Sequence, residues 1–171
     1  NYLSPLGFKL ELELFDGVDF FCQQANIPEI TMPVTQVPTR YRSVPIVPGG
    51  GVTFGDFSVQ FIIDEDLRNY MEIHNWMRAL GTPQDYGERT AWKTKFRDSP
   101  SQDVRFSDAT LQVLNNNNLA NFDVVFKDLF PVELSTLTFD VASEDNSFMT
   151  AEATFKYTLY EIRDVNQKTR R

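Results

Sequence analysis

The chain has 171 residues, a length typical of one domain and sufficient to bury a core without disulfides or metals. Its formal net charge of −8 disfavours a protein that grips nucleic acid, because such binding needs clustered lysine and arginine. No run of about 18 apolar residues is present, so we expect no membrane anchor, and the single cysteine, Cys22, excludes an intrachain disulfide.

The first elements are predicted to be two strands. Apolar and polar residues alternate over residues 8–14, which is typical of a half-buried strand. Asp16 and Gly17 favour a hairpin turn, and residues 20–24 are predicted to return as the second strand.

Residues 26–53 form a Pro/Gly-rich segment. It contains five prolines, and Gly49, Gly50 and Gly51 lie near its end. Proline removes donors from a strand ladder, so this segment is predicted to be an extended arm or edge strands. The three glycines are interpreted as a flexible hairpin tip, because no Lys-Ser/Thr pair follows them as a phosphate-binding loop requires.

A strand and then a helix are predicted next. Residues 57–63 alternate, and residues 66–80 place apolar side chains at helical spacing, with Asp66 as the expected cap and Gly81 and Pro83 as the stop. The apolar stripe of this helix comprises Leu67, Tyr70, Ile73, Met77 and Leu80. Residues 82–106 are predicted to be a long polar loop, and no second helix is expected.

The remainder of the chain is predicted to be strands. Residues 109–113 and 122–126 alternate around a turn at residues 115–118, four asparagines that tolerate left-handed backbone. Residues 150–162 are predicted as one long strand. We therefore expect a mainly β fold, an antiparallel β-barrel or two packed sheets with one flanking α-helix and long extended arms, in a single domain over residues 1–171.

No residue set converges on a reaction. One cysteine and one histidine are too few for a zinc site, and Asp64, Glu65 and Asp66 suit a helix N-terminus better than a cation site. His74 is interpreted as a packed or surface residue, and Cys22 as a buried inert thiol. The sequence therefore predicts no catalytic, cofactor-binding or metal-binding residues.

The order of several segments resembles a known family. A first alternating strand leads to residues 20–28 (FFCQQANIP), the Pro-rich arm and residues 53–61 (TFGDFSVQF). A helix containing Asn75-Trp76-Met77, then residues 130–134 (FPVEL) and 157–161 (YTLYE), complete the series. Across nearly the whole chain this order is similar to the tail tube proteins of T4-type contractile-tailed bacteriophages, and baseplate tube-initiator proteins share it.

The resemblance implies a structural, non-enzymatic role in the virion. Six subunits would close a ring edge to edge, and rings assembled in the host cytoplasm would stack into a hollow tube inside a contractile sheath. Sheath, tape-measure and baseplate proteins are the implied partners, and DNA would pass through without specific binding.

Two sets of residues are predicted to serve that role. One set belongs to the intersubunit arm: Arg40, Tyr41, Arg42, Gly49, Gly50 and Gly51. The other set shares the polar face of the last strand and is predicted to face the lumen: Thr150, Glu152, Thr154, Lys156 and Thr158. Three alternatives stay open: a baseplate tube initiator, a type VI secretion tube protein, and a monomeric β-barrel binding module.

Overall fold

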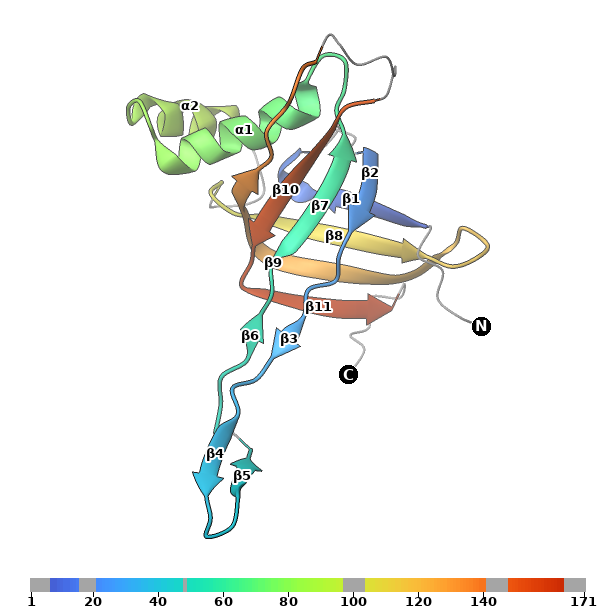
Figure 1. Ribbon diagram of the computed structural model, residues 1–171. Helices are drawn as coiled ribbons and strands as arrows, with labels where there is room; N and C mark the ends of the chain where they lie inside the picture. Colours follow the sequence, from blue (N-terminus) through green and yellow to red (C-terminus); the bar gives the residue numbers. More distant parts are fainter. Residues whose placement is uncertain (1–6, 16–20, 48, 97–103, 141–147, 165–171) are drawn as a thin grey trace.

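The computed structural model describes residues 7–15, 21–47, 49–96, 104–140 and 148–164 (Figure 1). Seven of its strands lie in two antiparallel sheets that share one long strand, β9 (Ala120–Leu134), and the other four form two short pairs. Sheet A contains β1 (Phe8–Leu12), β8 (Ser107–Leu114), the first part of β9 and β11 (Leu159–Asp164). Sheet B contains the end of β9, β10 (Thr150–Lys156), β7 (Phe57–Ile62) and β2 (Phe21–Ala25).

The mainly β prediction is confirmed, and two packed sheets describe the molecule better than a closed barrel. The hydrogen-bonded path runs β1-β8-β9-β10-β7-β2, and β11 adds to β9. In the part of the chain that the structure describes, β1 and β2 each pair on one side, so the path does not close on itself.

The predicted hairpin between the first two strands is wrong. β1 pairs with β8, with Leu10 opposite Leu111, whereas β2 pairs with β7 in the other sheet. A 3-10 turn, η1 (Glu13–Phe15), follows β1, and the Leu14 amide donates to Ser107 Oγ at 3.1 Å. Phe15 then packs edge-on against Trp76, which directs the chain into the core instead of back along β1. The Asp16-Gly17 pair lies outside the described residues.

The predicted strand over residues 150–162 is two strands. β10 pairs with residues 130–134 of β9, and β11 pairs with residues 122–127, so the chain crosses from sheet B to sheet A at Tyr157 and Thr158. β9 bends at the same level, where Asp128 adopts a left-handed φ of 54°. The Thr158 amide donates to the Lys127 carbonyl at 3.0 Å, which holds the crossing against β9.

The predicted helix exists as α1 (Arg68–Gly81), although its start differs from expectation. Leu67, with a φ of 58°, occupies the N-cap position and forms no capping hydrogen bond through its side chain, so the predicted cap at Asp66 is wrong. The buried Asn69 side chain instead donates to the Ile62 carbonyl at 2.8 Å, which joins the helix to the end of β7. The buried face is also shifted from the predicted stripe, and its members are Asn69, Ile73, Trp76 and Ala79.

The expectation of a single helix is wrong, because α2 (Gly87–Lys95) lies within residues 82–106, the segment predicted as a polar loop. Trp92 is its only buried side chain, and its indole donates to the Val104 carbonyl at 3.0 Å. Arg89 donates to the Leu80 carbonyl at 2.9 Å and so binds the end of α1. Ion pairs of Glu88 with Arg78 and of Lys95 with Glu72 also join α2 to α1. A helix held by one tryptophan and by polar contacts has no apolar stripe for sequence periodicity to detect.

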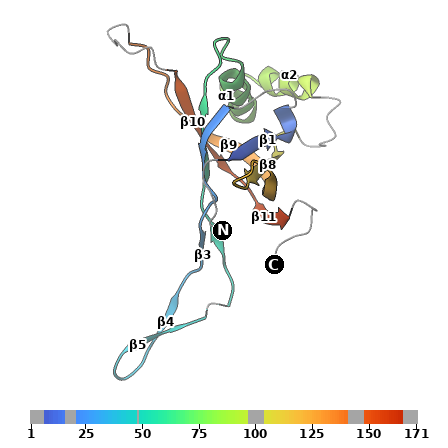
Figure 2. The same cartoon turned by 90° about the vertical axis from the view of Figure 1, so that its right-hand side faces the viewer.

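The core lies between the sheets. Phe57 of sheet B stacks on Phe126 of sheet A with ring centroids 4.2 Å apart, and Trp76 of α1 contacts Phe155 of sheet B. Figure 2 shows sheet B nearly edge-on, with both helices and sheet A on the same side of it. One face of sheet B is therefore left uncovered.

Candidate functional site

The most conspicuous surface feature is an arm, defined as residues 30–54, that extends away from the sheets (Figures 1 and 2). Near its base β3 (Ile30–Thr31) pairs with β6 (Thr53–Phe54). Farther out β4 (Thr35–Pro38) pairs with β5 (Ser43–Ile46) as a hairpin. In the part of the chain that the structure describes, β4 and β5 pair only with each other.

The arm tip is formed by residues 39–42. The Thr39 amide donates to the Arg42 carbonyl at 3.0 Å, and the Arg40 guanidinium lies 5.7 Å from the ring centre of Tyr41. Two arginines and a tyrosine are therefore exposed at the tip, and both residue types are favoured at protein interfaces.

The three predicted glycines lie elsewhere in the arm. Gly49, Gly50 and Gly51 belong to the return segment between β5 and β6, so their interpretation as a hairpin tip is wrong. Gly51 adopts a φ of 95°, a backbone conformation that a side chain would strain, and a Cβ there would lie 3.6 Å from Pro33.

Aromatic side chains fix the base of the arm to the sheets. Phe54 contacts Tyr160 at 5.6 Å and Tyr157 at 6.2 Å between ring centroids, and both tyrosines pack on Phe126. The Tyr157 hydroxyl donates to the Gly55 carbonyl at 2.9 Å, and the Tyr160 hydroxyl donates to the Pro28 carbonyl at 3.1 Å. Burial, with Tyr160 and Asp56 nearby, raises the pKa of Tyr157 to about 12, so this donor stays protonated.

Removing this anchor should loosen the arm. We expect Phe54→Ala to destabilise the fold by about 2 kcal/mol, less than a fully buried phenylalanine because Phe54 is half-buried. Denaturant unfolding at low protein concentration measures the loss. Phe139→Ala, at a side chain 76% exposed, is the control and should change stability little. Equal effects of the two substitutions would contradict the anchoring role.

The arm exposes apolar side chains that nothing in the described chain covers. Tyr41 is 89% exposed, Val47 87% and Val34 66%. Met32, Val37, Ile46 and Val52 are also exposed. So many exposed apolar side chains on one segment are typical of a site that contacts another macromolecule.

The uncovered face of sheet B carries four of the five residues predicted to face a lumen. Thr150, Glu152, Thr154 and Lys156 alternate with the buried Ala151, Ala153 and Phe155 along β10. Thr158 lies in the crossing between β10 and β11, so the predicted row ends at Lys156.

Register places polar residues of neighbouring strands beside this row. Gln60 lies between Glu152 and Gln24, and Thr154 lies between Ser58 and Glu133. Lys156 is bound to Asp56 by an ion pair of 2.5 Å. The one lysine in the row is therefore neutralised, and the face is polar with an excess of carboxylates.

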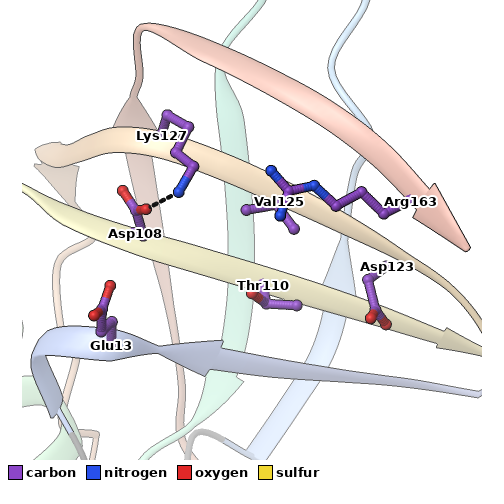
Figure 3. A pocket seen from close by; sticks show the side chains of 7 residues that line it. All are labelled: Glu13, Asp108, Thr110, Asp123, Val125, Lys127 and Arg163. Atoms are coloured by element: carbon purple, nitrogen blue, oxygen red, sulfur yellow. Dashed lines mark hydrogen bonds and ion pairs between the residues drawn. The ribbon is translucent and has the colours of Figure 1, made fainter. Parts of the chain in front are cut away.

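A shallow polar groove lies on the outer face of sheet A, and sequence reasoning missed it (Figure 3). Lys127 is paired with Asp108, and one oxygen of Asp123 is buried without a hydrogen-bond partner among the described residues. The other lining residues are Glu13, Thr110, Val125 and Arg163. These residues come from four separate elements, so no spacing in the sequence indicates the groove. Its charges largely offset one another and form no catalytic arrangement.

The residues considered for chemistry are dispersed. Over the described residues no group of three or more His, Cys, Asp or Glu side chains could hold a metal ion, and no helix is long and apolar enough to cross a membrane. His74 lies on α1, and its ring stacks near Tyr70 with the ring centroids 6.4 Å apart. Cys22 lies opposite Phe61 in the β2–β7 ladder, and burial raises the pKa of its thiol to about 12, which makes the reactive thiolate unfavourable.

Comparison with known proteins gives a consistent assignment. The family model described as "Phage tail tube protein" matches residues 2–163. The tail tube terminator protein of Enterobacteria phage T4 is 29% identical over 144 residues, which cover 82% of this chain and 75% of that protein.

Two solved structures share the fold. A chain of the anti-feeding prophage baseplate has a TM-score of 0.63 at 12% identity, with 96% of this chain and 97% of that chain covered. A chain of the anti-feeding prophage cap, a tube terminating cap, has a TM-score of 0.62 at 13% identity, with coverage of 96% and 93%. At these identities the likeness concerns the fold alone.

Proposed function

The chain belongs to the phage tail tube protein family, and from that premise we propose that it forms hexameric rings that enclose a conduit for the genome. As a member of this family it is a structural component of a phage tail and not an enzyme. We further propose that a single tail-tube-like domain over residues 1–171 assembles with copies of itself in the host cytoplasm and remains in the virion.

The open sheet edges are the observation that carries this proposal. Exposed edges present unpaired N–H and C=O groups, and proteins normally cover or close them. In sheet B one open edge is β2, which pairs only with β7 among the described strands. The other is the end of β9, because β8 pairs with β9 only as far as Leu129.

The two open edges of sheet B are different surfaces, as a ring of identical subunits joined head to tail requires. A contact between unlike surfaces of identical subunits repeats around an axis and closes when the rotation fits. If β2 of one copy lies beside residues 130–134 of the next, the four-stranded B sheets join into one continuous barrel. That barrel leaves none of the B-sheet edges open.

In such a barrel the uncovered face of sheet B lines the bore. Sheet A and both helices lie on the opposite side and so face outward. The bore then carries Glu152, Glu133 and the Lys156–Asp56 ion pair. An excess of carboxylates repels phosphate and lets DNA pass without being held.

A second candidate role is a terminating ring at one end of the tube. The T4 relative, named a tail tube terminator protein, favours it. A tube subunit occurs in many rings of each tail and a terminator in one, so the copy number per particle distinguishes the two. In either position we propose that the partners are further tube rings, the surrounding sheath, the tape-measure protein and baseplate proteins.

Native mass spectrometry of the purified protein tests ring formation. We expect a species of six times the monomer mass that grows with protein concentration, because edge pairing is bimolecular. A protein that remains monomeric at every concentration would favour the monomeric binding module instead.

A further inference from the structure

Each open edge of sheet B contains a β-bulge. The register of β2 against β7 skips Gln23, and the register of β9 against β10 skips Val132. A bulge adds one residue to its strand and bends it locally. Pro131, beside the bulge in β9, also carries no N–H. Bulges and prolines keep an edge strand from pairing with unrelated chains, so both edges are restricted in what they can pair with.

The bulge in β2 changes the order of its buried and exposed side chains. Cys22 and Ala25 are half-buried and pack against the core. Gln23 and Gln24, which lie between them, are both exposed. Residues 22–25 are therefore core-facing, exposed, exposed and core-facing, whereas a regular strand alternates one by one.

The bulge in β9 produces the same order. Pro131 is buried, and Leu134 is half-buried and packs against the core. Val132 and Glu133, which lie between them, are both exposed. Residues 22–25 and 131–134 thus carry one four-residue pattern on the two edges that the proposed ring brings together.

Neighbouring copies would present these two segments in opposite directions. The strands of sheet B pair antiparallel at each step from β9 through β10 and β7 to β2. With four strands over the described residues, the first and the last run in opposite directions. Rotation about the axis of a barrel keeps this relation, so β2 meets β9 of the next copy as an antiparallel strand.

We propose that the two bulges fix the register in which neighbouring copies join. In this register core-facing side chains lie opposite core-facing ones and exposed side chains opposite exposed ones. The four pairs between copies are Cys22–Leu134, Gln23–Glu133, Gln24–Val132 and Ala25–Pro131. A regular strand tolerates a slip of two residues, because such a slip restores its faces. Here a slip of either one or two residues places a core-facing side chain opposite an exposed one.

The register has a consequence for the size of the ring. In a closed barrel the number of strands and their stagger together determine the diameter. Edges that join in one register only therefore give rings of one size. This inference rests on the proposed ring, and it adds the residues that set how its subunits align.

Disulfide trapping tests the register. Directly opposite residues have Cβ atoms about 5 Å apart, whereas a displacement of two residues adds roughly 6–7 Å along the strand, which a disulfide does not span. All variants carry Cys22→Ala, which removes the native thiol. Gln24→Cys with Val132→Cys should then cross-link neighbouring copies under mild oxidation, and a non-reducing gel should show covalent oligomers up to the hexamer.

The matched control is Gln24→Cys with Phe130→Cys, which moves the second thiol by two residues along β9. We expect at least about tenfold less cross-linked protein from this pair, because it reports the slipped register. Gln23→Cys with Glu133→Cys reports the proposed register at a second position and should cross-link as the first pair does.

Native mass spectrometry of each reduced variant establishes beforehand that rings are present. Cross-linking of the opposite pairs and not of the control supports the inference. Rings in which the control cross-links as well as the opposite pairs, or in which no pair cross-links, would show that the bulges do not set the register, and the ring proposal would survive that result. A protein that forms no rings contradicts both proposals.

Discussion

A chain whose outer hairpin, residues 35–46, is replaced by a short Gly-Ser linker is expected to fold and form rings but not to stack them. β4 and β5 pair with each other and contribute no residue to the core, so the domain loses little stability. The linker leaves the Ile30–Phe54 and Thr31–Thr53 pairs and the aromatic anchor in place. Stacking should be lost because the variant lacks Arg40, Tyr41 and Arg42.

The measurements are a melting temperature, a native mass spectrum and microscopy of concentrated protein. We expect the first two to match the wild type and stacks to be absent. Replacement of residues 116–118 in the β8–β9 turn by the same linker is the control, since that turn also lies away from the core. A truncated chain that still builds tubes would show that the arm is dispensable for stacking, whereas one that remains monomeric would assign the arm to ring closure.

Arginines on the uncovered face of sheet B should block genome passage without blocking assembly. Thr150→Arg with Thr154→Arg places two guanidinium groups per subunit beside Glu152 on β10. In a ring these groups would face the bore and bind phosphate, so DNA would be held instead of sliding. Phage particles carrying this substitution should have normal tails and an infectivity per particle at least about tenfold lower.

Thr90→Arg with Thr94→Arg is the matched control. It adds the same two groups on α2, where both threonines are exposed and each hydroxyl donates to the carbonyl one turn earlier. We expect this variant to infect normally. If the β10 variant also infects normally, β10 does not line the bore, and the uncovered face must serve another contact.

The strands that could be predicted from sequence are those with one face in the core. In β7, buried Phe57, Val59 and Phe61 alternate with half-buried polar residues, and β8 and the first part of β9 behave alike. Period-two alternation reports which residues are buried, and that is a local property of the chain. The four asparagines between β8 and β9 correctly predicted a turn, because asparagine tolerates left-handed backbone and Asn118 adopts a φ of 57°.

Strand partners could not be predicted because pairing is set by tertiary packing. The first two strands are neighbours in sequence, yet β1 pairs with β8 and β2 with β7. Apolar and polar residues alternate almost continuously through β10 and β11. The two strands are separate because they pair with different parts of β9, on either side of its bend at Asp128. α2 was not predicted because it is held by Trp92 and by polar contacts with α1, which leave no apolar periodicity in the sequence.

Candidate surfaces formed by one segment could also be predicted from sequence, whereas a surface formed by several segments could not. Arg40, Tyr41 and Arg42 were found because their residue types are unusual in a Pro-rich segment, and they do form the tip of the arm. The polar row on β10 was found from its alternation. The groove on sheet A joins residues distant in sequence, so it could not be seen before the fold was known.

A cryo-electron microscopy reconstruction of the assembled protein would show which strands meet between neighbouring subunits. We predict a six-fold ring in which β2 of each copy hydrogen-bonds to residues 130–134 of its neighbour, with β10 lining the bore. A reconstruction in which these edges remain solvent-exposed, or in which sheet A lines the bore, would contradict it.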